Sequence, residues 1–191
     1  MILGTVALLV GGCASRDGGE SAQPGASQGE APLAAGTLLA EARKGDFVLQ
    51  LETEKANYRA NEPVKLKARL KYDGPLPEVT IGHAASPLSF LIRETTRGIE
   101  IPYPMPTPLI RTKLKNGEWF EEAYAKAGGY GEQDPDKDFI KRFLTGEAFP
   151  EGRYEIAASA DFELYEGEPD RPGTKDVDYR IVTDKIRIDA D

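Results

Sequence analysis

The sequence predicts an all-β fold, an antiparallel β-sandwich with a short helical insertion. From residue 46 onward, apolar side chains recur at every second position in short runs, which is the pattern of strands that bury one face. Turn-forming residues separate these runs, and the 191-residue chain holds 20 Gly and 14 Pro. Both residue types interrupt helices, so this composition argues against a helical bundle.

Charge and the rare side chains exclude several classes of function. The chain carries 24 Lys and Arg against 32 Asp and Glu, a net charge of −8, whereas nucleic-acid binding needs clustered basic charge. It has one His and one Cys, which excludes most zinc sites, a disulfide within the chain and Cys–His catalysis. We therefore expect neither a cofactor nor a metal ion.

The N-terminus carries an export signature. Met1–Val10 is apolar and uncharged, too short for a membrane-spanning helix but suited to the apolar core of a secretory signal. Val10-Gly11-Gly12-Cys13 follows at once and resembles the lipobox of bacterial lipoproteins, in which the Cys is lipidated and becomes the mature N-terminus. The resemblance implies that residues 1–13 are signal peptide and lipobox, and that Cys13 anchors the protein in a membrane. Ala14 after the Cys implies the outer membrane if the source has two membranes.

Residues 14–45 are predicted to be a flexible tether. Up to Gly36 the segment is built from small and polar residues, and Leu33 is its only large apolar side chain. Such a segment cannot bury enough surface to offset the entropy of ordering it. Thr37–Lys44 has the composition of one or two helical turns with Thr37 as the cap. The folded domain is then residues 46–191.

Two strands are predicted at the start of the domain. Residues 47–52 alternate apolar and polar side chains, and residues 64–72 alternate apolar side chains with a basic row. Between them, Tyr58–Val64 resembles the Y-x-x-G-E-x-V turn that opens the second strand of bacterial immunoglobulin-like and macroglobulin-like domains. Asn61 stands where that turn has Gly, and Asn tolerates the left-handed conformation better than most residues.

The middle of the domain is predicted to hold short, interrupted strands. Residues 79–83 and 88–92 alternate with opposite parity, which indicates a turn or bulge at Ala84–Pro87. Ile99 and Ile101 continue the sheet. Ile101–Ile110 then has Pro at every second position from 102 to 108, so we expect an extended crossing between sheets or a sheet edge. Residues 110–114 form another strand.

A short helix is predicted over Glu118–Ala127. This segment has helix-forming residues, Phe120 and Tyr124 four positions apart, and Gly128-Gly129 as a stop. Residues 135–145 fit either a second helix, capped by Asp134-Pro135, or a strand, and the expected architecture favours the strand.

A tyrosine near the C-terminal strands is the best marker of the fold. Phe149–Ile156 resembles the corner that starts strand F of immunoglobulin-like sandwiches, where the Tyr154 hydroxyl would bond to upstream backbone. Strands follow to residue 164 and over 179–188, with a bulge near 183–185. The resemblance covers about residues 46–189 and implies an immunoglobulin-like sandwich. There the second strand and strand F belong to different sheets, so the basic row and an acidic row should lie on opposite outer faces; the acidic row is Glu155, Asp161 and Glu163.

No catalytic or metal-binding arrangement stands out. His83 is the only imidazole, and although Ser86 and Ser89 are near it in sequence, there is no strained nucleophile turn. Asp134, Asp136 and Asp138 resemble the start of a calcium loop, but that loop needs Gly and Glu where this chain has Phe139 and Thr145. We therefore expect a solvated turn there, and no enzyme.

Two functions of different classes remain open. The first is a non-catalytic, lipid-anchored envelope lipoprotein with an extracytoplasmic sandwich that binds a protein or polysaccharide partner. The second is a peptidase inhibitor, which would present a long exposed loop such as 166–174 or 101–110. The candidate partner-binding residues are the aromatic and basic side chains Trp119, Phe120, Tyr124, Tyr130, Lys65, Lys67, Arg69 and Lys71.

Overall fold

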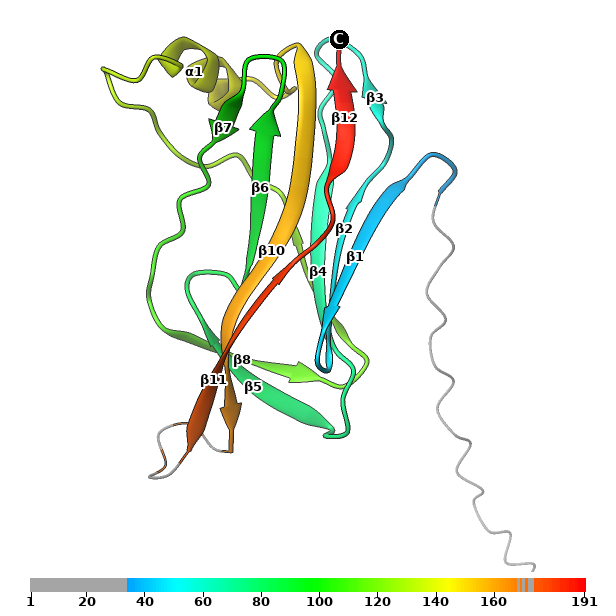
Figure 1. Ribbon diagram of the computed structural model, residues 1–191, viewed down its shortest axis with the longest axis vertical. Coiled ribbons are helices and arrows are strands. Elements are labelled where there is room, and N and C mark those ends of the chain that lie inside the picture. Colours follow the sequence, from blue (N-terminus) through cyan, green and yellow to red (C-terminus); the bar gives the residue numbers. More distant parts are fainter. Residues whose placement is uncertain (1–33, 168, 170, 172–173) are drawn as a thin grey trace, which may run out of the picture. The chain divides into compact units, whose positions relative to one another are not determined.

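The protein folds as an all-β sandwich of two sheets (Figure 1). The computed structural model describes residues 34–167, 169, 171 and 174–191. The predicted signal peptide, Cys13 and residues 14–33 of the predicted tether lie outside these ranges.

The smaller sheet has four antiparallel strands, and the larger sheet is built around one long strand. In order, the smaller sheet contains β1 (Leu38–Lys44), β2 (Phe47–Thr53), β4 (Leu66–Tyr72) and β9 (Trp119–Ala123). The long strand of the larger sheet is β10 (Gly152–Glu166). Around it lie β3 (Asn57–Tyr58), β5 (Glu78–His83), β6 (Leu88–Glu94), β7 (Ile99–Ile101), β8 (Ile110–Lys115), β11 (Lys175–Val182) and β12 (Ile186–Ala190).

The neighbours of β10 are broken on both sides. On one side β6 pairs with residues 154–160 and β5 with residues 163–165, and the backbone N–H of Asp161 bonds to the carbonyl of Pro87 between them. On the other side β12 and β11 take successive parts of β10, separated at Thr183, whose hydroxyl accepts a hydrogen bond from the Ala158 N–H. The interruptions predicted at 84–87 and 183–185 are therefore confirmed. The larger sheet is mixed, because β3 pairs with β12 in parallel.

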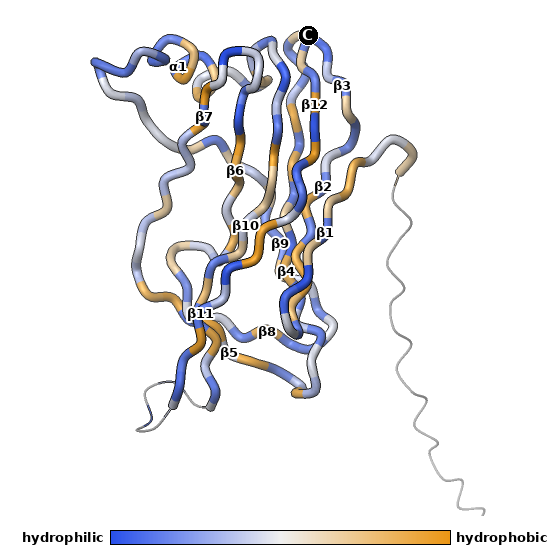
Figure 2. The backbone as a smooth tube through the Cα atoms, viewed as in Figure 1, coloured by the Kyte–Doolittle hydropathy of each residue, from blue (hydrophilic) through white to orange (hydrophobic). Residues whose placement is uncertain are grey.

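The core lies between the sheets and follows the alternation of the strands. Phe47, Leu49 and Leu51 of β2 are at most 1 % exposed. The ring of Phe47 meets the rings of Phe162 and Tyr179 at centroid distances of 4.9 and 5.0 Å, which joins the smaller sheet to the larger one. Figure 2 shows the alternation of apolar and polar residues along these strands. Each such apolar side chain contributes about 1.5–3 kcal/mol by leaving water.

The second-strand turn and the two outer faces follow the sequence prediction. Asn61 has a φ of 63°, the left-handed conformation expected where the related turns have Gly. β4 and β10 lie in different sheets, so the basic row and the acidic row are on opposite outer faces.

The predicted secondary structure is wrong for three segments, and two of them are strands of the smaller sheet. Thr37–Lys44 is not helical and not part of a tether: it contains β1, which pairs with β2 along its length. Glu118–Ala127 is not a helix, because β9 pairs there with β4 and completes the smaller sheet. Phe120 and Tyr124 share a face in a strand as well as in a helix, so their spacing did not discriminate.

The helix is instead α1 (Lys137–Thr145), in the segment for which a strand was favoured. Its buried side chains, Phe139, Ile140 and Phe143, have helical spacing. For the proline-rich segment, only the first of the two predicted alternatives is wrong. It does not cross between sheets, because it links β7 to β8, which are both edge strands of the larger sheet.

Lys126 fastens the end of α1 to the rest of the domain. Its ammonium donates hydrogen bonds to the carbonyl oxygens of Phe143, Gly146 and Ala148 at 2.6, 2.7 and 2.7 Å. It also lies 4.7 Å from the centroid of the Phe143 ring. Burial lowers the pKa of Lys126 to about 8, and the three carbonyls favour its charged form at neutral pH. A cation at this position satisfies carbonyls that the helix leaves without partners.

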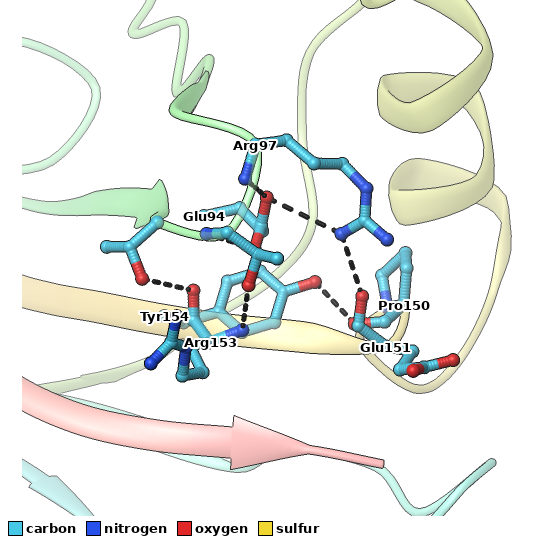
Figure 3. Close-up of polar contacts among 8 residues, drawn as sticks. Glu94, Arg97, Pro150, Glu151, Arg153 and Tyr154 are labelled. Atoms are coloured by element: carbon cyan, nitrogen blue, oxygen red, sulfur yellow. Dashed lines mark hydrogen bonds and ion pairs between the residues drawn. The ribbon is translucent and has the colours of Figure 1, made fainter.

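The tyrosine corner and a buried carboxylate lie together at the start of β10 (Figure 3). The Tyr154 hydroxyl donates to the carbonyl of Pro150 at 2.5 Å, and the residue is 1 % exposed, as predicted. Glu94, which is fully buried, accepts hydrogen bonds from the backbone N–H groups of Thr96 and Arg97 at 2.7 and 2.8 Å. A Cβ at Gly152 would lie 2.7 Å from Oε1 of Glu94, so this position requires glycine.

Replacing Tyr154 with Phe should lower the free energy of unfolding by about 1–3 kcal/mol, because the Pro150 carbonyl loses its buried partner. Urea denaturation of the two proteins measures the difference. A variant as stable as the wild type would contradict the role of the hydroxyl bond.

Replacing Glu94 with Gln should also destabilise the fold, by about 1.5–3 kcal/mol at pH 7, because a buried charged acceptor is lost. Burial alone would raise the pKa of Glu94, but the hydrogen bonds from Thr96 and Arg97 outweigh it and lower the pKa below its ordinary value. Because the pKa of Glu94 is lower in the folded than in the unfolded state, its ionised form stabilises the fold at pH values above the ordinary carboxyl pKa. This stabilisation is lost as the pH falls through the folded-state pKa.

The difference between wild type and Glu94→Gln should therefore shrink in acid, which urea denaturation at pH 7 and pH 3 would measure. Glu151→Gln is the matched control, since only the backbone carbonyl of Glu151 bonds to Arg97. A difference in unfolding free energy between wild type and Glu94→Gln that is equally large at both pH values would contradict this account.

Candidate functional site

A groove lies where the larger sheet divides between β5 and β6. Its volume is about 480 Å³. Asp161, Phe162 and Glu163 of β10 and Asp178 of β11 line one part of it, and the turn at 84–87 and the proline-rich connection line the other. The Ala85 N–H donates to the Pro106 carbonyl at 2.9 Å, which holds the connection against the turn. In Figure 1 the connection runs from β7, near α1, to β8 at the opposite end of the molecule.

The carboxylates of the groove face outward because of strand parity. Tyr154, Ile156 and the other even-numbered residues at the start of β10 face the core, so Asp161 and Glu163 lie on the outer face. In the register of the sheet, Glu163 lies directly opposite Asp178. Like charges in directly opposite positions destabilise a sheet. Within the described part of the chain, none of these three carboxylates forms an ion pair, although Arg180 is opposite Asp161 in register.

The other wall of the groove carries exposed apolar side chains beside the polar ones of Ser86 and Thr107. Leu109 is 61 % exposed, and Met105 and Pro108 lie near it along the same connection. Figure 2 shows the hydrophobic stretch where this connection enters β8. Tyr103 anchors the wall from inside, because its ring packs against Phe90 at a centroid distance of 5.8 Å. The groove therefore combines an acidic floor with a supported apolar rim.

His83 lines the groove but is used structurally. It is 7 % exposed, its Nδ1 donates to the carbonyl of Ala84 at 2.8 Å, and its Nε2 lies 2.7 Å from Oγ1 of Thr112. The Ser86 hydroxyl donates to a carboxylate oxygen of Glu122 at 2.7 Å and accepts from the Leu88 N–H. These bonds orient the turn at 84–87, and they do not align Ser86 with the imidazole as a nucleophile needs.

The predicted basic row is largely neutralised by neighbouring strands. Lys67 pairs with Glu52 at 2.8 Å, and Lys65 pairs with Glu54 at 3.0 Å. Arg69, which is 7 % exposed, lies 3.6 Å from carboxylate oxygens of Glu52 and Glu121. Because acidic partners flank it on both sides, the row presents little net positive charge for an anionic partner.

The four candidate aromatic residues do not form one surface. Trp119 lies on β9, with Arg69 and Lys71 at 4.7 and 4.8 Å from its ring. Phe120 and Tyr124 pack against the core, and burial raises the pKa of Tyr124, whose hydroxyl is buried without a hydrogen-bond partner. Tyr130 is exposed. Phe120 and Tyr124 are therefore structural, and Trp119 and Tyr130 face different surroundings.

Only part of the groove could be predicted from the sequence. The parity break at 84–87 and the outward acidic residues were visible, but their meeting with the proline-rich connection depends on long-range pairing.

Asp134, Asp136 and Asp138 lie in the turn before α1 or within it, and the Asp136 N–H bonds to the Asp134 carboxylate. Among the described residues, no three His, Cys, Asp or Glu side chains are arranged to hold a metal ion.

Comparisons with known proteins add no relative. No protein-family model matches the chain, and a search of curated proteins finds no significant match. In the part of the chain that the structure describes, no helix has the length and apolar character needed to cross a membrane.

Replacing Lys65, Lys67 and Lys71 together with Gln should leave retention on a dextran sulfate column nearly unchanged, because acidic side chains already neutralise the row. The variant should lose about 1 kcal/mol of stability, since each exposed cross-strand pair contributes roughly 0.2–1 kcal/mol. Column retention and urea denaturation test both expectations. A marked loss of retention at low salt would show that the row is an anion-binding surface.

Proposed function

We propose that this protein is a non-catalytic envelope lipoprotein, anchored through a lipidated Cys13, whose extracytoplasmic β-sandwich binds a protein partner in the groove beside β10. The observation that carries the proposal is the groove itself, which joins an acidic floor to an exposed apolar rim. Rigid strands position the floor, while other prominent charges, such as Glu155 with Lys185 and Arg187, are engaged in ion pairs.

The lining of the groove favours a protein over a polysaccharide. Sugar-binding surfaces present exposed aromatic rings, whereas the aromatic residues of this groove, Tyr103 and Phe162, pack into the core. The exposed groups include the carboxylates of Asp161 and Asp178, Thr107, Pro108 and the aliphatic side chain of Leu109. Carboxylates and an apolar rim complement the side chains of a polypeptide.

One observation favours a peptidase inhibitor as the second candidate. Leu109 protrudes from a connection without regular secondary structure, as the reactive residue of an inhibitory loop would. Against this, the connection is held by the Ala85–Pro106 hydrogen bond and faces a groove. A panel of serine, cysteine and metallopeptidases separates the two functions, because only the inhibitor blocks one of them with stoichiometry near one to one.

Replacing Cys13 with Ser should release the protein from the membrane fraction and remove the mass of the lipid. Cell fractionation and mass spectrometry of the two proteins measure this. A variant that remains in the membrane fraction, together with a parent that carries no lipid, would refute the anchor.

Partner binding is tested by placing a photo-crosslinking residue, p-benzoylphenylalanine, at Leu109 in cells. Leu76, which is 55 % exposed and outside the groove, is the matched control site. We expect a discrete crosslinked product from position 109 alone, and its loss when Asp161 and Glu163 are replaced with Lys. Equal labelling from both sites, or labelling that survives the double replacement, would refute the groove as the binding site.

A further inference from the structure

We propose that the occupant of the groove is an extended polypeptide segment with basic residues at alternate positions and an apolar residue between them. This inference rests on the proposed function and specifies the chemistry of the partner. Three features of the groove support it: the spacing of its carboxylates, the like-charged pair of Glu163 and Asp178, and the apolar side chains of the rim.

The spacing of the carboxylates matches an extended chain. Asp161 and Glu163 are two residues apart on β10 and lie on the same face. Strands rise about 3.3 Å per residue, so these positions repeat at roughly 6.6 Å. An extended peptide along β10 repeats its side chains on each face at the same distance. Lys or Arg at positions i and i+2 of the peptide can therefore meet both carboxylates at once, whereas adjacent basic residues point to opposite sides.

Arg180 lies opposite Asp161 in the sheet, but among the described residues Glu163 has an acidic cross-strand neighbour instead. Glu163 and Asp178 are cross-strand neighbours of like charge, an arrangement that destabilises a sheet. Further along β10 the same outer face shows the opposite arrangement, because Glu155 pairs with Lys185 and Arg187 at 2.9 and 3.1 Å. A basic residue bound above Glu163 and Asp178 would relieve their repulsion, so these charges complement a cationic segment.

The apolar rim specifies the residue between the two basic ones. In an extended segment the side chain at i+1 points away from those at i and i+2. When the basic side chains face the carboxylates of β10, the intervening residue does not compete for the floor, and Met105 and the exposed Leu109, which line the same groove, can offer it apolar contact. The preferred pattern is therefore basic–apolar–basic.

A divalent cation is a poorer occupant than a peptide. The described residues contain no group of three acidic or imidazole side chains arranged to hold a metal ion. A metal also leaves the exposed side chain of Leu109 without a role. Calcium is accordingly one of the competitors in the test.

The test uses two fluorescein-labelled peptides of equal composition, one containing Lys-Leu-Lys and the other Lys-Lys-Leu, within the same Gly/Ser flanks. Fluorescence anisotropy measures their binding to the full chain. We expect the alternating peptide to bind at least tenfold more tightly and to weaken as salt is raised, since exposed charges are screened within about 8 Å at physiological ionic strength.

The chain offers a matched pair of variants. Asp161→Asn, Glu163→Gln and Asp178→Asn together should weaken binding of the alternating peptide at least tenfold. The control replaces Glu147 and Glu151 with Gln and Asp184 with Asn, which removes the same charge outside the groove, and it should change binding less than twofold. All six residues are on the surface, and equal urea midpoints would show that both variants fold.

Equal binding of the two peptides, an equal effect of the two variants, or displacement of the peptide by millimolar calcium would each overturn the inference. The proposed function can survive that result. If crosslinking from Leu109 still captures an envelope partner, the groove binds a protein of other chemistry. If the protein with wild-type carboxylates gives no crosslinked partner at all, the proposed function itself is refuted.

Discussion

The pairing of β10 with two interrupted neighbours on each side is the constraint on which the rest of the structure depends. A single strand of fifteen residues holds β6 and β5 on one side and β12 and β11 on the other. Because each side changes partner along β10, the sheet divides instead of continuing flat. That division creates the groove, turns the proline-rich connection across its edge and leaves Asp161 and Glu163 facing outward.

Polar groups at the C-terminal end of α1 and at the start of β10 fix this arrangement. Tyr154 ties the start of the strand to Pro150, while Glu94 holds the turn after β6 against Gly152. Lys126 gathers three carbonyls at and beyond the end of α1. Tyr154 and Glu94 are themselves buried, so a partner lost at either would cost more than one lost on the surface.

Local sequence patterns predicted the strands and turns that depend on neighbouring residues. The features that depend on pairing between strands distant in sequence could not be predicted in this way. Alternation located β2, β4 and most of β10. The Tyr154 hydroxyl bond was expected from a resemblance to immunoglobulin-like domains, and the left-handed Asn61 from its place in a turn. The segment around Phe120 became a strand because β4 offered an unpaired edge, which no local spacing encodes. The basic row was placed correctly, yet its neutralisation by Glu52 and Glu121 depends on strand order.

The four prolines between Ile101 and Ile110 have a consequence for the kinetics and selectivity of recognition. Each proline fixes its own φ and restricts the residue before it, so the rim of the groove has little freedom to lose when a partner arrives. The packing of Tyr103 against Phe90 and Tyr124 adds to this preorganisation. Because this rim is already ordered, it loses little conformational entropy when a partner binds. It discriminates by shape because it adapts poorly to segments that do not fit.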